Sequence, residues 1–190
     1  MSSEQLVCRL GNLHSSLHND GALMLERILK TVGEMLLDRS YQEVTRAPRP
    51  LEAIDEGRPV YESEQLDVYM HIDDKVGVKF TRQVLERERN AIIVSIDGPT
   101  TFAKKECDGR VVQFLHARTL LENVTHHKLV PRHERILALP EGLTAAQIPK
   151  LLDTDPIVLY HNWPPGTLVR ITRIFGGHQP TVYFRAVAAT

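Results

Sequence analysis

The sequence predicts an α/β fold in two parts, residues 1–122 and 123–190, on three observations. Strand-like and helix-like segments alternate between residues 66 and 115, as in a small domain with a partly parallel sheet. The apolar, β-branched run 91–96 is typical of a strand covered on both faces. Two strand-like segments close the chain, and no acidic residue follows Asp155. The second part is therefore expected to be an α+β domain ending in a β-hairpin.

The first predicted helix follows Asp20, which is expected to cap it. Its apolar residues recur at i, i+3, i+4 and i+7, so one face should be buried. They are Leu25, Ile28, Leu29, Val32, Met35 and Leu36. Prolines and Gly57 interrupt any period between residues 45 and 59, and this segment is interpreted as an exposed linker loop.

The alternating segments that follow are three strands, two helices and two turns. The strands are expected at 66–72, 91–96 and 110–115, the helices at 77–90 and 100–107, and the turns at 73–75 and 108–109.

The second part contains shorter elements. Thr144 and Gln147 fit a capping box before a short helix, and Pro149 fits the first turn of a helix carrying Leu151 and Leu152. Asp155 followed by Pro156 predicts a helix start. Strands are expected at 168–175 and 181–187, joined by a loop with Gly176 and Gly177.

The composition excludes several classes of protein. A net charge of −1 and a pI near 6.8 do not fit a binder that depends on bulk positive charge. Two cysteines, Cys8 and Cys107, cannot form a multi-disulfide framework. No apolar run approaches the ~20 residues of a membrane span, and the N-terminus lacks a signal-peptide pattern. An intracellular protein without membrane contact is expected.

Three nearby histidines, His126, His127 and His133, raise the possibility of a metal site. Their spacing fits no zinc motif, and Pro131 would break a helix aligning the rings. A structural or interface role is favoured, and no cofactor is expected.

A magnesium-dependent nuclease is the enzymatic alternative. Asp67, Asp73, Asp74 and Lys75 supply carboxylates and a lysine near a strand end. Residues 73–75 equally fit a charged turn, which is the commoner arrangement. Basic residues from 75 to 118 are mixed with glutamates, so at most a weak phosphate contact is expected, at Lys104 and Lys105.

Two blocks of the second part carry a family resemblance. Residues 123–133 (NVTHHKLVPRH) and 148–160 (IPKLLDTDPIVLY), followed by a VRITR strand, resemble the fifth subunit shared by eukaryotic nuclear RNA polymerases and the equivalent subunit of archaeal polymerase. The positions that match the family pattern are His127, Leu129, Val130, Pro131, His133, Pro149, Asp155, Pro156, Tyr160, Gly166, Arg173 and Arg185.

The resemblance implies a non-catalytic nuclear subunit with two tasks. It implies that residues 1–122 form a jaw near downstream DNA, and that residues 123–190 form an assembly domain packing on the largest subunit through the matching residues. A free interaction adaptor with the same domain is the remaining alternative.

Two departures from the family pattern stand out. Leu159 occupies the place of an arginine, and the sequence after Arg173 differs through Gln179. These departures suggest a divergent copy dedicated to one polymerase, which would be nucleolar if that enzyme is polymerase I.

Overall fold

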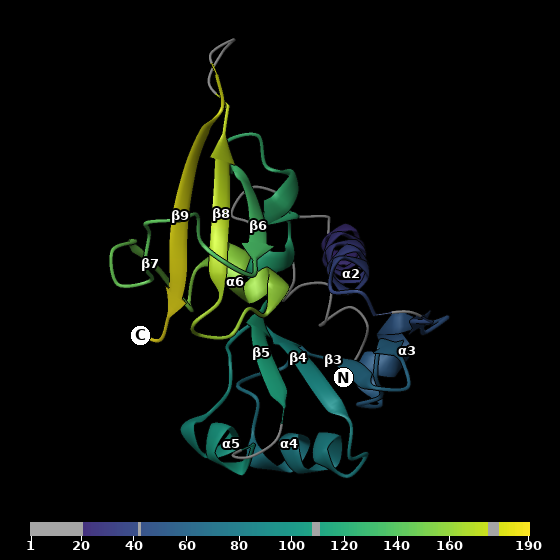
Figure 1. Ribbon diagram of the computed structural model, residues 1–190. Coiled ribbons are helices and arrows are strands. Elements are labelled where there is room, and N and C mark those ends of the chain that lie inside the picture. The colour runs from purple at the N-terminus through teal and green to yellow at the C-terminus, as the bar shows by residue number, and fades with distance from the viewer. Residues whose placement is uncertain (1–20, 42, 108–110, 175–178) are drawn as a thin grey trace. The chain divides into compact units, whose positions relative to one another are not determined.

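The computed structural model of the chain describes residues 21–41, 43–107, 111–174 and 179–190 (Figure 1). Two compact units, residues 1–122 and 123–190, each contain a β-sheet, so the α/β class is confirmed. The predictions for Asp20, for the turn at 108–109 and for Gly176 and Gly177 lie outside the described residues. No helix among those described has the length and apolar character needed to cross a membrane.

Helix α2 (Gly21–Asp38) confirms the predicted apolar stripe, because all six stripe residues are buried. The hydroxyl of Tyr61 donates a hydrogen bond to the carbonyl of Leu29 at 2.8 Å, next to Gly33. A Cβ atom at Gly33 would lie only 3.2 Å from that hydroxyl oxygen, so glycine permits this close approach.

The interpretation of residues 45–59 as a linker loop is wrong. The segment forms strand β1 (Thr45–Arg46) and helix α3 (Pro50–Asp55), with Ala53 and Ile54 buried. Pro50 is the first residue of α3. The N–H group at this position has no partner within a helix, so its absence in proline costs no helical hydrogen bond. The proline therefore starts a helix here instead of preventing one.

The five-stranded sheet of the N-terminal unit has the order β1-β2-β3-β4-β5. Strands β3 (Leu66–His71), β4 (Asn90–Ser95) and β5 (Val112–His116) are parallel, whereas β2 (Tyr61–Glu62) pairs antiparallel with β1 and β3. Successive residues of β4 are buried, which confirms a strand covered on both faces. Helices α4 (Val78–Leu85) and α5 (Thr101–Glu106) make the crossovers and contact each other (Figure 1).

Helix α4 ends five residues before the predicted end at residue 90, because the chain turns toward Asp67 of β3. Glu88 adopts a left-handed backbone conformation, with φ of 53°. Arg87 Nε lies 3.1 Å from Asp67 Oδ2, and Arg89 Nη1 lies 3.4 Å from Asp67 Oδ1. These ion pairs hold the turn against the start of the parallel strands.

Asp67 itself is only 1% exposed, and burial raises its pKa although both arginines favour the charged form. Asp73 and Asp74 are instead exposed in the turn after β3. The buried, arginine-paired Asp67 is thus not available as the exposed metal ligand that the nuclease alternative required.

The C-terminal unit begins after the 3₁₀ helix η1 (Ala117–Leu120) with a second one, η2 (Val124–His126). Its sheet has the order β6-β8-β9-β7. Strands β6 (Arg132–Ile136), β8 (Leu168–Arg173) and β9 (Thr181–Ala188) pair antiparallel, and β7 (Lys150–Leu152) runs parallel to β9. The predicted closing pair of strands is confirmed within the described residues.

Two predicted helices before Asp155 are wrong. The backbone N–H of Thr144 donates to Gln147 Oε1 at 2.9 Å, as in half of a capping box, but only a turn follows. A helix starting there would require Pro149 to donate to the carbonyl of Ala145, and proline has no N–H. Leu151 and Leu152 lie in β7 instead, where Leu151 joins the core.

Helix α6 (Pro156–His161) begins as predicted. Asp155 Oδ1 accepts a hydrogen bond from the backbone N–H of Ile157 at 2.9 Å, and Asn162 ends the helix in a left-handed conformation. Val158 packs with four other buried side chains against Trp163. The group is Leu151, Val158, Val169, Ile171 and Val187.

We expect Asp67→Asn to remove a pH dependence of the free energy of unfolding. Because the pKa of Asp67 is raised in the folded state, ionisation of this carboxyl lowers the free energy of unfolding as pH rises through the folded-state pKa. The variant should therefore gain stability relative to wild type as the pH rises above about 4, the ordinary pKa of an unfolded aspartate. Urea unfolding followed by circular dichroism measures the difference, with exposed Asp73→Asn as the control. A difference that stays flat or declines with pH contradicts this expectation.

We expect Asp155→Ala to lower the free energy of unfolding of the C-terminal unit by about 0.5–2 kcal/mol, because α6 loses its N-cap. Trp163 is the single tryptophan of the chain and packs on that unit's core, so its fluorescence reports the transition. Asp155→Asn retains an accepting oxygen and should keep most of the stability. Equal midpoints for the alanine variant and wild type would show that the cap contributes nothing.

Candidate docking site of the C-terminal unit

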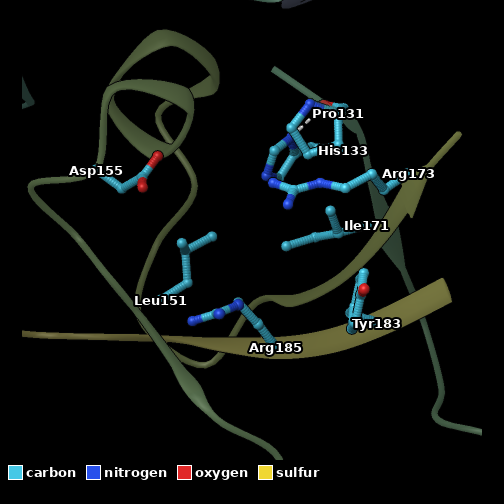
Figure 2. A pocket seen from close by; sticks show the side chains of 8 residues that line it. All are labelled: Pro131, His133, Leu151, Asp155, Ile171, Arg173, Tyr183 and Arg185. Atoms are coloured by element: carbon cyan, nitrogen blue, oxygen red, sulfur yellow. Dashed lines mark hydrogen bonds between the residues drawn. The ribbon is translucent and has the colours of Figure 1, made fainter. Parts of the chain in front are cut away.

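A hollow of about 500 Å³ lies on one face of the C-terminal sheet (Figure 2). Five of the twelve residues that carry the family resemblance line it, although they come from four separate segments of the chain. The lining consists of Pro131, His133, Leu151, Asp155, Ile171, Arg173, Tyr183 and Arg185. The fold therefore gathers residues that the sequence separates by more than fifty positions.

Strand register explains this gathering. Ile171 of β8 pairs with His133 of β6 on one side and with Tyr183 of β9 on the other. Directly paired residues place their side chains on the same face, so these three form a row across the sheet. Arg173 lies two residues beyond Ile171, and Arg185 pairs with Val169, so both arginines share this face.

Three of the polar side chains are held by hydrogen bonds. His133 Nδ1 lies 2.7 Å from the carbonyl oxygen of Pro131, and since a carbonyl only accepts, Nδ1 carries the proton. Arg185 Nη1 donates to the carbonyl of Lys150 in β7 at 3.0 Å. Asp155 uses Oδ1 to cap α6. Backbone contacts thus fix where these groups lie in the hollow.

Four of the other matching residues stabilise the fold of the C-terminal unit itself. Tyr160 is buried, and its hydroxyl accepts a hydrogen bond from Asn123 Nδ2 at 3.1 Å. Pro156 begins α6, and Gly166 adopts a φ of 90° that favours glycine. The carbonyl of Pro149 accepts a hydrogen bond from the backbone N–H of Ala186 at 3.2 Å.

The remaining three matching residues lie outside the hollow, in the segment before β6. His127 Nδ1 accepts from the backbone N–H of Leu129 at 3.3 Å, and Val130 is half-buried. Leu129 is 82% exposed.

Sequence analysis missed Leu151, Ile171 and Tyr183 as lining residues. Alternation along the two closing strands was the available signal, since it places Ile171 on the same face as Arg173. It also places Tyr183 on the same face as Arg185, but which face of one strand matches which face of the other depends on the register of the hairpin.

The opposite face of the sheet carries a different arrangement of charge. Arg170 Nε donates to Glu134 at 2.9 Å, and Arg132 lies 2.7 Å from the same carboxylate. The hydrogen bond from Arg170 lowers the pKa of Glu134. Both arginines are therefore paired with one carboxylate of the chain itself.

In the N-terminal unit, Lys104 and Lys105 lie exposed in the last turn of α5. Neighbouring Glu106 accepts from Arg82 Nε at 2.8 Å, and Phe102 is 73% exposed. The described part of the chain contains no group of three or more His, Cys, Asp or Glu side chains that could hold a metal ion.

Residues 122–187 match the family described as RNA polymerase Rpb5, C-terminal domain. The chain is 33% identical over 180 residues to subunit rpabc1 of DNA-directed RNA polymerases I, II and III from Dictyostelium discoideum, covering 78% of this chain and 89% of that protein. It is 41% identical over 70 residues to DNA-directed RNA polymerase subunit Rpo5 from Methanococcus maripaludis, covering 36% of this chain and 90% of the archaeal protein.

A plant relative also matches most of the chain. DNA-directed RNA polymerase subunit 5-like protein 1 from Arabidopsis thaliana is 23% identical over 157 residues, covering 78% of this chain and 73% of its own length. The similarity thus extends beyond the residues of the C-terminal family model. Taken with the matching motif residues, these similarities show that the chain belongs to the Rpb5 family of DNA-directed RNA polymerase subunits.

Proposed function

We propose that the chain is a non-catalytic structural subunit of a multi-subunit nuclear RNA polymerase, docked on the largest subunit through residues 123–190. Its relatives are named as subunits of DNA-directed RNA polymerases, among them the nuclear enzymes I, II and III, so its partners are other polymerase subunits. The observation that carries the docking role is the hollow that gathers Pro131, His133, Asp155, Arg173 and Arg185.

Charge supports docking on an acidic surface. Residues 123–190 contain seven lysines and arginines against four acidic residues, a net charge of +3. Residues 1–122 contain sixteen against twenty, a net charge of −4. Since complementary potentials favour the correct pairing of surfaces, the C-terminal unit suits an acidic partner better than the N-terminal unit does.

Exposed apolar side chains support a permanent interface. Leu129, Leu152, Val182 and Tyr183 are 82%, 49%, 46% and 45% exposed. Large side chains of this kind supply the buried core of stable interfaces, with arginines among them. Docking would remove them from water.

For the N-terminal unit we propose the jaw position near downstream DNA, with at most a weak contact through Lys104 and Lys105. Both lysines are exposed and lie at one end of α5. The unit's net negative charge opposes binding to phosphates, so any contact depends on the assembled polymerase to bring DNA near.

We further propose that this copy serves a single polymerase, in the nucleolus if that is polymerase I. Leu159 replaces the arginine of the family pattern within α6, and Ile174, the first departing residue after β8, is 71% exposed. Apolar side chains at positions where the family pattern has different residue types would change the contacts with neighbouring subunits.

We expect Arg173→Ala to weaken retention of the chain by the largest subunit while leaving the C-terminal unit folded. Loss of one charged anchor at a docked surface costs about 2 kcal/mol or more, roughly thirtyfold in affinity. Affinity capture of the tagged chain from cells, with quantification of the largest subunit, measures this. Arg170→Ala is the matched control, because Arg170 lies on the opposite face of the same strand and pairs with Glu134. Wild-type retention of Arg173→Ala would refute the docking role.

We expect DNA binding by the full chain to depend only shallowly on salt. Each neutralised phosphate contributes about one unit to the slope of log affinity against log salt concentration, so two lysines give a slope no steeper than about −2. Fluorescence anisotropy with a labelled duplex measures the slope for wild type and for the double variant Lys104→Ala, Lys105→Ala. The matched double variant Lys75→Ala, Lys79→Ala changes the same charge elsewhere on the unit. Tight, sequence-selective binding would contradict the proposed jaw contact.

A further inference from the structure

We propose that strand β9 pairs with an extended segment of the polymerase subunit on which the chain docks, which adds a strand to the C-terminal sheet beside residues 181–185. This inference rests on the proposed docking function and adds the backbone contact through which docking occurs. Strand β7 lies beside only one end of β9, where it pairs with residues 186–188 (Figure 1). We call the remainder of that side of β9, along residues 181–185, the open edge.

The backbone of β9 directs hydrogen-bonding groups toward the open edge. The N–H of Ala186 donates at 3.2 Å to the carbonyl of Pro149, on the β7 side of the strand. Backbone groups of successive residues point to alternate sides of a strand, so Val182 and Phe184 direct their N–H and C=O groups to the same side as Ala186. Within the described part of the chain, these groups of Val182 and Phe184 have no hydrogen-bond partner.

Pro149 ends the pairing of β7 with β9. Continued in the same parallel register, the ladder would next need the N–H of residue 149 to donate to the carbonyl of Phe184. Proline has no N–H, so the chain cannot make this bond itself. A strand supplied by another protein can make it.

The other edges of this sheet are protected. On the outer side of β7, the carbonyl of Lys150 accepts from Arg185 Nη1 at 3.0 Å, and that of Leu152 accepts from the N–H of Asp155 at 3.0 Å. Strand β6 has the sequence RHERI, and charged side chains of this kind keep an edge strand from pairing. Residues 181–184, with the sequence TVYF, carry no charge. The open edge is therefore the part of the sheet best suited to accept a strand.

The side chains beside the open edge define the segment that fits. Val182 and Phe184 lie on one face of the sheet and Tyr183 on the other, and Val182 and Tyr183 are 46% and 45% exposed. Aromatic and β-branched residues pair best with one another across strands, so the segment is expected to be rich in these types.

Charge further restricts the occupant. Arg185 ends the open edge, and residues 123–190 carry a net charge of +3. The segment is therefore expected to contain acidic residues and to lack lysine and arginine. A second copy of the chain would bring the same positive charge, which opposes the pairing of two such edges.

The test is hydrogen–deuterium exchange at single-residue resolution, on the free full chain and on polymerase captured through the tagged chain. In the free chain we expect fast exchange of the amides of Val182 and Phe184, and slow exchange of those of Tyr183 and Arg185, which face β8. In the captured polymerase, exchange at Val182 and Phe184 should slow by about tenfold or more, because both become paired.

A proline substitution supplies a second measurement. Val182→Pro removes one N–H from the open edge and none from the pairing with β8. Retention of the other polymerase subunits should weaken by about tenfold. Arg135→Pro is the matched control, since it removes an N–H that faces away from β8 on the charged edge of β6, and should change retention by less than about twofold. Trp163 fluorescence checks that both variants fold.

Four outcomes would overturn the inference. Slow exchange at Val182 and Phe184 in the free chain at every concentration would show that the chain itself pairs with the open edge, and slow exchange only at high concentration would identify a second copy. The others are fast exchange that persists in the captured polymerase and wild-type retention of folded Val182→Pro. The exchange measurement uses the unaltered chain, so it decides the matter without the variants.

The same capture separates this inference from the proposed function. If the tagged chain brings down polymerase subunits while Val182 and Phe184 still exchange fast, docking stands and strand pairing fails. If it brings down no polymerase subunit, the proposed function and this inference both fail.

Discussion

Strand β8 pairs with β6 on one side and β9 on the other, and this pairing decides which side chains of the C-terminal unit line the hollow. Val169 and Ile171 enter the core, so Arg173 must follow them onto the same face. A slip of one residue in either pairing would bring Arg170 toward the core and remove the row of His133, Ile171 and Tyr183. The core therefore fixes the face on which Arg173 lies, because burial of two apolar residues leaves the arginine no alternative position.

The residues that match the family divide into two groups by what they contact. Tyr160, Pro156 and Gly166 hold the unit together through a buried hydrogen bond, a helix start and a left-handed turn. His133, Arg173 and Arg185 place polar groups in an open hollow. Asp155 belongs to both groups, since its carboxylate caps α6 and also lines the hollow. A loss of function at Asp155 must therefore be separated into folding and binding by measuring both.

Elements with a strong local signal were predictable from the sequence. The stripe of α2 extends over about three turns, and Asp155 with Pro156 determines the start of α6 through local backbone chemistry. The predictions for the short segments near Pro50 and Pro149 were wrong. A proline favours a helix that begins at it, as at Pro50, and disfavours a helix that would contain it, as at Pro149. The end of α4 also depends on Asp67, which is distant in the sequence. Its ion pairs with Arg87 and Arg89 cannot be read from a local sequence pattern. Likewise, the motif identified Arg173 and Arg185 as candidates, whereas their convergence required the register of three strands.

Pro149 has a consequence for the conformational choice of the segment before Asp155. Ala145, Ala146, Gln147 and the leucines of β7 are good helix formers, so the local preference of residues 143–152 conflicts with the turn and the short strand β7 that they form. Pro149 resolves the conflict by making a continuous helix unfavourable. Only in the strand does the carbonyl of Lys150 lie where it accepts the hydrogen bond from Arg185. One missing N–H group thus selects between two secondary structures, and through that selection it sets the orientation of an arginine 36 residues further along the chain.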